Sequence, residues 1–368
     1  MKHIQEIIKQ YLSNLGLQVK TDIYGYGVVG ILNGDKKGKK IAWRADMDAL
    51  PNDFPDKVDF KSKVKGVQHG CGHDIHMAIA LGIAEVLAKN KKSLHGTVYF
   101  IFQPEEETFV GAKKMIENGL LSKINPDEIY GLHVTALPVG QILVKKNEIF
   151  AYQKRIRIEL KNDLSNEEIK ELTNKIHSSL SRAQIGSKPW EIQYIGDPKI
   201  GLASPNTIFK DYLIIDEDFS SYSGNDTLFL EANLYETDAA NLRKIIPQIK
   251  QVIEVGGYRE QLLSVSFIME NPTVINDPEL TDFAVKTLEN IYGKGGLIKD
   301  YGQCPFFNDD FAYFQQKIPG VYFLLGGSNL EKGIVALNHA PGFEVDEECI
   351  RTGGKSFLSL ILKRLNEK

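Results

Sequence analysis

The chain has 368 residues, of which 42% are hydrophobic and 25% are charged, and its formal net charge is −4. These values are ordinary for a globular protein with room for two domains. The weak negative charge and the lack of a long basic run argue against nucleic acid or an anionic membrane as a partner, and small-molecule substrates remain open.

The sequence also indicates the cellular compartment. The opening residues, MKHIQEIIKQYLSNLGL, carry charges throughout and lack the apolar centre of a signal peptide. No stretch approaches the roughly 18 to 20 apolar residues of a membrane span. The cysteines, Cys71, Cys304 and Cys349, are odd in number and far apart, which does not favour a disulfide framework. We therefore expect a cytoplasmic protein.

The first third of the chain alternates strands with helices. Strands are expected at 26–34, 39–51, 96–104 and 127–134, and helices at 1–17, 74–92 and 111–121. The strand at 96–104 is continuously apolar, as in strands buried on both faces of a sheet. The alternation predicts an α/β fold with an open, mostly parallel sheet and crossover helices.

The pattern changes near Ala151. Alternating strands and amphipathic helices follow in the order β-α-β-β-α-β, which is typical of a ferredoxin-like sandwich. Ser165 and Glu168 form a capping signature for the helix expected at 165–185. We therefore predict an inserted ferredoxin-like α+β domain at 152–270. The α/β pattern then resumes, so residues 1–151 and 271–368 would together form the other domain.

Three strands of the first domain run into polar residues that could bind a metal. Asp46 and Asp48 follow the first of these strands, Glu105–Glu107 follow the second, and His133 ends the third. Because ligands bind beyond the carboxyl ends of strands in open α/β sheets, we expect these side chains to converge. Three adjacent carboxylates at a buried edge would repel one another unless cations neutralised them. A pair of metal ions would supply that charge.

A glycine-flanked Cys71 and His73 precede the long helix, and the glycines would leave room for a ligand or an ion. Thiolate and imidazole suit zinc and similar metals. The alternative is a glycine-rich loop with a buried cysteine and incidental histidines. Taken singly, His133 could be a satisfied core residue and His339 lies in a turn-rich stretch. His76 could support the site or simply form the polar side of its helix.

Five segments resemble the amidohydrolase branch of the M20 metallopeptidase family. They are RADMDALP (44–51), HGCGHDIHMA (69–78), FQPEEE (102–107), GLHV (131–134) and NHAPGFEVDE (338–347). That branch includes N-acyl amino acid hydrolases, N-acetyl-diaminopimelate deacetylases and indole-acetyl amino acid hydrolases. Any one segment alone would be a weak signal, but the five occur in the family's order at suitable separations.

The resemblance implies a site with two divalent ions, zinc or manganese, with cobalt or nickel also compatible with such ligands. Its metal ligands correspond to Cys71, His73, Glu107, His133 and His339. Glu106 corresponds to the general base, which would take a proton from metal-activated water and pass it to the departing amine. Asp46 and Asp48 are expected to support the site without binding metal. The inserted domain resembles the family's lid, which commonly mediates a homodimer.

The inserted domain also departs from the family. The usual Gly-Lys-Gly-Gly-His segment is missing after the first strand of this domain, and Tyr235 stands where the branch has an arginine that contacts the substrate carboxylate. Asn206 lies in a partly kept Asn-Val-Ile-Pro segment. Asn206 and Tyr235 are therefore the candidate substrate contacts. We expect unusual specificity on the amine side of the substrate.

Three functions follow from these residues. The first is a metal-dependent deacylase of N-acyl amino acids or related small amides. The second is a dipeptidase or exopeptidase using the same site. The third is a non-catalytic binding protein, against which the retention of Glu106 argues.

Overall fold

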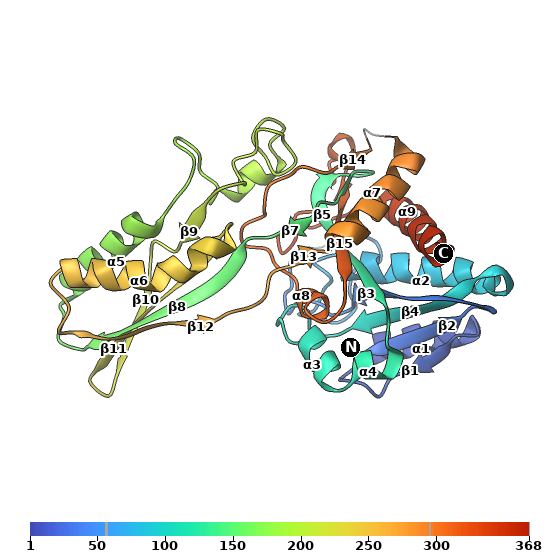
Figure 1. Cartoon of the computed structure of the whole chain (residues 1–368), viewed down its shortest axis with the longest axis horizontal. Coiled ribbons are helices and arrows are strands. Elements are labelled where there is room, and N and C mark those ends of the chain that lie inside the picture. Colours follow the sequence, from blue (N-terminus) through green and yellow to red (C-terminus); the bar gives the residue numbers. More distant parts are fainter. Residues whose placement is uncertain (56–57, 294–295, 368) are drawn as a thin grey trace. The chain divides into compact units, whose positions relative to one another are not determined.

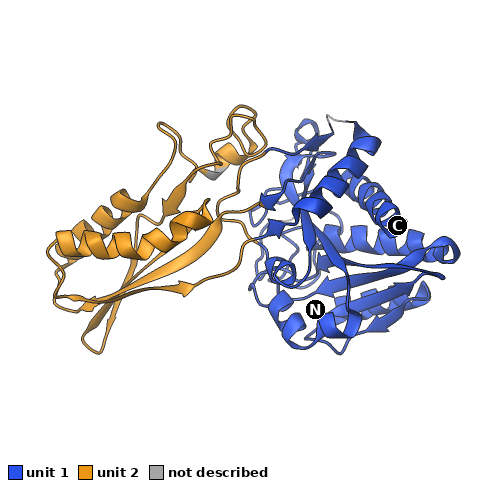
Figure 2. Ribbon diagram, viewed as in Figure 1, with its two compact units in different colours: residues 1–147, 274–300, 309–368 blue, residues 148–273, 301–308 orange. Residues whose placement is uncertain are grey.

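The structure is a computed structural model that describes residues 1–55, 58–293 and 296–367 (Figure 1). It divides into two compact units, coloured separately in Figure 2. Unit 1 comprises residues 1–147, 274–300 and 309–368, and unit 2 comprises residues 148–273 and 301–308. The segment 301–308 has no counterpart among the sequence predictions. It joins unit 2 through a backbone bridge between Phe150 and Cys304, a long-range pairing with no local signature.

Unit 1 is built on an eight-stranded sheet in the order β1-β2-β4-β3-β5-β15-β6-β14. The central strands β4, β3, β5 and β15 are parallel, and β1 and β2 extend one edge antiparallel. The sheet confirms the predicted open, mostly parallel α/β fold. Its strands are β1 Gln18–Lys20, β2 Val28–Asn33, β3 Lys36–Asp46, β4 His95–Gln103, β5 Glu128–Pro138, β6 Ile142–Leu143, β14 Leu297–Ile298 and β15 Gly320–Ser328.

Helices cover this sheet because their apolar faces must be buried against it. The long helix α2 packs on β3, β4 and β5, and α9 packs on β3 and β15. Between these layers lie Trp43 and Phe323, both in contact with the ring of Phe357 at centroid distances of 5.0 and 4.8 Å. The helices of unit 1 are α1 Lys2–Asn14, α2 His73–Lys89, α3 Gly111–Glu117, α4 Leu120–Ile124, α7 Pro278–Tyr292, α8 Ala312–Gln315 and α9 Glu348–Leu365.

The helix predicted at 111–121 is wrong as a single element. It is two short helices, α3 and α4, separated at Asn118 and Gly119. Gly119 has φ of 83°, a left-handed conformation that ends a helix and that glycine adopts without strain. Two further short elements, β7 Asn147–Glu148 and β13 Ile275–Asn276, pair where the chain leaves and re-enters unit 1.

Unit 2 has the ferredoxin-like arrangement that its element order predicted. Its antiparallel sheet runs β10-β11-β8-β12, with β9 beside β11. The helices α5 and α6 bury their apolar faces with those of the strands in one core. The elements are β8 Tyr152–Lys161, α5 Asn166–Leu180, β9 Leu213–Ile215, β10 Ser220–Gly224, β11 Thr227–Glu236, α6 Ala239–Val255 and β12 Leu262–Met269.

The predicted capping box at the start of α5 is confirmed, since Ser165 and Glu168 each accept a hydrogen bond from the other's backbone. The helix ends at Leu180, earlier than the predicted 185. Arg182 lies outside the helix, because its backbone N–H donates to the Leu213 carbonyl at 3.0 Å and its carbonyl accepts from the Leu213 N–H at 2.9 Å. In the part of the chain that the structure describes, no helix is both long and apolar enough to cross a bilayer.

Candidate metal centre

The register of the parallel strands brings three chain segments to one level at the edge of the sheet. Asp46, the last residue of β3, lies opposite Gln103, the last residue of β4. On the other side Arg44 lies opposite Gly131 of β5, so His133 stands level with Asp46. Convergence at this edge follows from strand direction and register, as the residue pattern predicted.

The loop before α2 places Cys71 and His73 above this edge. Gly72 between them has φ of 88°, and a Cβ there would lie 2.2 Å from Cγ1 of Val134. The glycine therefore serves a left-handed turn and a close approach to β5. This corrects the expectation that room for a ligand explains the glycine.

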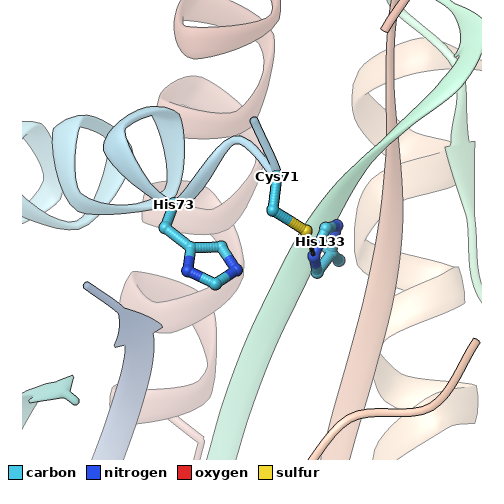
Figure 3. A group of neighbouring side chains, drawn as sticks. All are labelled: Cys71, His73 and His133. Atoms are coloured by element: carbon cyan, nitrogen blue, oxygen red, sulfur yellow. Dashed lines mark hydrogen bonds between the residues drawn. The ribbon is translucent and has the colours of Figure 1, made fainter. Parts of the chain in front are cut away.

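Two groups of three side chains share Cys71. One group is Cys71, His73 and His133, and the other is Cys71, Glu107 and His339, with the ligand atoms of each group all within 4.8 Å of one another. The sulfur of Cys71 lies 3.3 Å from Nε2 of His133 and 3.1 Å from Nε2 of His339. In Figure 3 the thiol of Cys71 points at the His133 ring, with the His73 ring beside them.

The tautomers suit a metal site. Nδ1 of His133 donates to the Val134 carbonyl at 2.7 Å, and Nδ1 of His73 donates to the Asp48 carbonyl at 2.9 Å. Each ring thus turns its Nε2 inward, where this nitrogen can bind a metal once it carries no proton, the usual arrangement for a metal-binding histidine. Among the described residues, Nε2 of His73 and Oε1 of Glu107 are buried without a hydrogen-bond partner, and they lie 3.8 Å apart. Such orphaned atoms fit a cation between them.

Supporting contacts hold these ligands in place. Asp48 accepts a hydrogen bond at 3.0 Å from the backbone N–H of Glu107, whereas Asp46 accepts one at 2.5 Å from Nδ1 of His76. Nε2 of His76 accepts from the backbone N–H of Val134 at 2.8 Å, which leaves it no lone pair for a metal. Of the two readings left open for His76, the structure favours support of the site.

The backbone separates the three adjacent glutamates. Glu105 is exposed, has φ of 58°, and accepts a hydrogen bond from the Tyr24 hydroxyl at 2.7 Å. Glu106 is buried, and Oε2 of its side chain lies 3.8 Å from Nε2 of His73. The expectation that all three carboxylates crowd one edge is therefore wrong for Glu105, because its left-handed backbone turns the side chain outward.

Buried carboxylates make this site attractive to positive charge. Burial alone would lower the pKa of His73, but the carboxylates of Asp46, Asp48 and Glu107 outweigh it and raise that pKa to about 9. Burial, reinforced by Glu107 and Glu106, raises the pKa of the Cys71 thiol well above its usual range. A proton on His73 thus occupies the place that the donor set offers to a metal cation, and metal binding must displace protons.

The histidines of this centre are expected to make the metal-free protein less stable on both sides of about pH 6.5. Burial lowers the pKa of both His76 and His133 to about 4, so stability is present above about 6.5 and is lost as the pH falls towards 4. Each histidine contributes up to about 3 kcal/mol to this acid limb. The raised pKa of His73 acts oppositely, because its stabilisation is present below pH 6.5 and is lost as the pH rises through about 9.

Urea unfolding of chelator-treated protein from pH 4 to 10 measures the loss of stability on both the acid and the alkaline side. His3→Gln on the exposed side of α1 is the control, and a flat profile contradicts the prediction.

The two candidate substrate contacts lie in unit 2. Asn206 is exposed, whereas Tyr235 is 8% exposed and packs edge-on against the ring of Phe306 at 4.8 Å. The metal-capable residues belong to unit 1. The substrate role of both residues stays a prediction.

Sequence reasoning missed a buried polar cluster beside Glu106. Arg44 is 1% exposed and forms ion pairs with Asp46, Asp309 and Asp310. Its signal in the sequence was an arginine inside an apolar strand, because a buried arginine needs carboxylate partners. The acidic partners at 309 and 310 are more than 260 positions away, and nothing local links them to Arg44.

Comparisons with known proteins show the family of this chain. Residues 42–363 match the family described as peptidase family M20/M25/M40. The chain is 33% identical to thermostable carboxypeptidase 2 of Saccharolobus solfataricus over 370 residues, covering 98% of this chain and 90% of that protein. It is 30% identical to N-acetylcysteine deacetylase of Bacillus subtilis over 341 residues, covering 91% and 84%. The crystal structure of the Bacillus subtilis YXEP protein, a dinuclear metal binding peptidase from the M20 family, superimposes with a TM-score of 0.78 at 26% identity, covering 99% and 92%.

The fold and the site define this chain as a metallohydrolase of carbon–nitrogen bonds, either an amidohydrolase or a peptidase. It belongs to peptidase family M20/M25/M40.

Proposed function

We propose that this chain hydrolyses the amide bond of N-acyl amino acids or related small amides. The observation that carries the proposal is the pair of ligand groups sharing Cys71, with buried orphan atoms on His73 and Glu107. Cys71, His73, Glu107, His133 and His339 would hold two divalent ions, zinc or manganese, since thiolate, imidazole and carboxylate suit both. Bound there, the ions would polarise the amide carbonyl and acidify water.

Glu106 is the proposed general base and acid. It belongs to neither of the two groups that share Cys71, although its carboxylate also lies near His73 and Glu107 in a third possible ligand group. We assign metal binding to Glu107, whose Oε2 lies 3.2 Å from Nε2 of His339, and proton transfer to Glu106. Burial, with the charges of Asp309 and Asp310, raises its pKa well above the usual range for glutamate. A carboxylate with a raised pKa accepts a proton from water and releases it to the leaving amine more readily at neutral pH.

The direct test is amine release from a panel of N-acyl amino acids and dipeptides. The protein is stripped with a chelator and reloaded with zinc or manganese. We expect turnover only after reloading, with N-acetyl amino acids above free dipeptides. Binding of two ions without turnover on any member of the panel contradicts the proposal.

A peptidase is the second candidate, because relatives at 33% identity over nearly the whole chain are thermostable carboxypeptidases. The two functions use the same metal ligands and differ in the group on the amide carbonyl. Competition between an N-acetyl amino acid and the matching free dipeptide at equal concentration separates them. Preferential cleavage of the free dipeptide would favour the peptidase.

Tyr235→Arg is expected to raise the preference for substrates with a free carboxylate. An arginine can bind a carboxylate through two parallel hydrogen bonds, which Tyr235 cannot. We expect the ratio of kcat/KM for an N-acetyl amino acid to that for its carboxamide to rise about tenfold, or about 1.4 kcal/mol. Tyr222→Arg, on an exposed tyrosine of β10, is the matched control. An unchanged ratio in a folded Tyr235→Arg variant removes the support for this substrate contact.

A further inference from the structure

A buried carboxylate closes the loop that carries Glu106 and Glu107. This loop leaves β4 after Gln103 and enters α3 at Gly111. Oδ1 and Oδ2 of Asp310 accept from Nε2 of Gln103 at 2.7 and 2.8 Å, and Oδ2 also accepts from the backbone N–H of Ala112 at 2.8 Å. Asp310 therefore ties together the two ends of the segment between them, residues 104–111.

The loop needs such a tie because its backbone is strained. Glu105 and Phe109 both have φ of 58°, a left-handed conformation that side chains other than glycine adopt at a cost. The ends also approach closely, since a Cβ on Gly111 would lie 1.7 Å from the carbonyl oxygen of Pro104. A strained conformation persists only where its surroundings over-determine it.

Asp310 is itself held firmly. It is fully buried, and Nη2 of Arg44 donates to its Oδ1 at 2.9 Å. Nε of Arg44 also donates to Oε1 of Gln103 at 2.9 Å. Arg44, Gln103 and Asp310 thus form a closed triangle of hydrogen bonds, and each member comes from a different chain segment. The middle of the loop is fixed separately, where the Glu107 N–H bonds to Asp48.

We propose that Asp310 is a positioning residue that sets the loop bearing Glu106 and Glu107 at the metal centre. This inference rests on the proposed function. Asp310 acts on both glutamates together through its hydrogen bonds to Gln103 and Ala112, at the two ends of the loop. Loss of the tie should therefore impair the metal ion that Glu107 binds and the proton transfer by Glu106. It should leave unimpaired the ion held by Cys71, His73 and His133.

Asp310→Asn tests this role, because an amide keeps the size of the side chain but presents a donor towards Arg44 or towards Ala112. Titration of the chelator-treated protein with zinc should show one ion bound as in the unaltered chain. The second ion should bind about 10- to 100-fold more weakly. With both ions saturating, kcat should fall about 100-fold while KM stays within about threefold. His339→Ala serves as the reference for loss of the second ion.

A double variant that moves the carboxylate from position 310 to position 103 distinguishes positioning of the loop from general destabilisation of the fold. In the double variant Asp310→Asn with Gln103→Glu, a carboxylate at position 103 can accept from Arg44 and from the new amide at position 310. We expect the kcat of this double variant to be at least tenfold higher than that of Asp310→Asn. We also expect the double variant to recover the binding of the second ion. Glu128→Gln is the matched control, since Glu128 is also a buried carboxylate paired with an arginine, Arg364, but at the opposite end of β5.

Three outcomes overturn the inference. In the first, Asp310→Asn retains the second ion and kcat. In the second, Asp310→Asn and Glu128→Gln lose equal amounts of kcat and of second-ion binding, and these losses scale with the fall in the thermal unfolding midpoint. In the third, the double variant is no better than the single one. If the unaltered chain turns over no substrate, the proposed function fails, whereas the zinc titration still decides the role of Asp310.

Discussion

Glu106→Gln is expected to lower kcat by about 10²- to 10⁴-fold, the usual contribution of a general base. Glutamine has nearly the same size and keeps one oxygen, but it cannot take a proton from water at neutral pH. Glu106 lies near His73 and Glu107 but outside the two groups that share Cys71, so we expect the content of two metal ions to stay unchanged. Steady-state kinetics together with metal analysis of the same sample measures both quantities.

Glu105→Gln is the matched control for this change. It removes a carboxylate from the adjacent position, but that carboxylate is exposed and bonded to Tyr24. We expect kcat to remain within about twofold, since surface changes of this kind have small effects. Equal losses in the two variants would contradict the assignment of the base to Glu106. Loss of metal from Glu106→Gln would instead make Glu106 a ligand.

Cys71→Ala is expected to remove both metal ions and reduce turnover below detection. The Cys71 thiol is common to both ligand groups. Without it, each ion would have only two side chains left from its group. His133→Ala removes a ligand from one group alone and should leave one ion bound. Metal analysis after dialysis is therefore expected to give two ions for the unaltered chain, one for His133→Ala and none for Cys71→Ala.

Cys349→Ala provides the control for loss of a buried thiol. Cys349 lies in α9 within the main core of unit 1, and its replacement should cost stability without changing metal content. Two ions retained by Cys71→Ala would contradict the shared role of Cys71. The same result would reopen the reading in which the cysteine is an ordinary buried residue.

Local residue patterns were sufficient for the fold class. The apolar run of β4 and the helical periodicity of α2 each follow from near neighbours in sequence, as does the capping box at Ser165. The β-α-β-β-α-β order likewise defined the ferredoxin-like arrangement of unit 2. Metal-capable residues at strand ends could be grouped because parallel strands direct their carboxyl ends to one edge.

The chemistry of individual residue types set the remaining expectations about the site. A cysteine and a histidine near three glutamates favour a metal over a loop without function. The resemblance to a known family then connected these residues to His339, which the pattern alone left open.

Only the tertiary structure decided which atoms face the centre. Three adjacent glutamates look equivalent in the sequence, but a left-handed backbone turns Glu105 to solvent and leaves Glu106 buried. The sequence left open whether His76 supports the site or only forms the polar side of its helix, and the hydrogen bonds at both of its ring nitrogens favour support. The contacts of Asp310 with Gln103 and Ala112 join positions about 200 residues apart, so no local pattern contains them. Backbone conformation and long-range hydrogen bonds arise from packing of the whole unit, whereas strand and helix patterns arise from near neighbours in the chain.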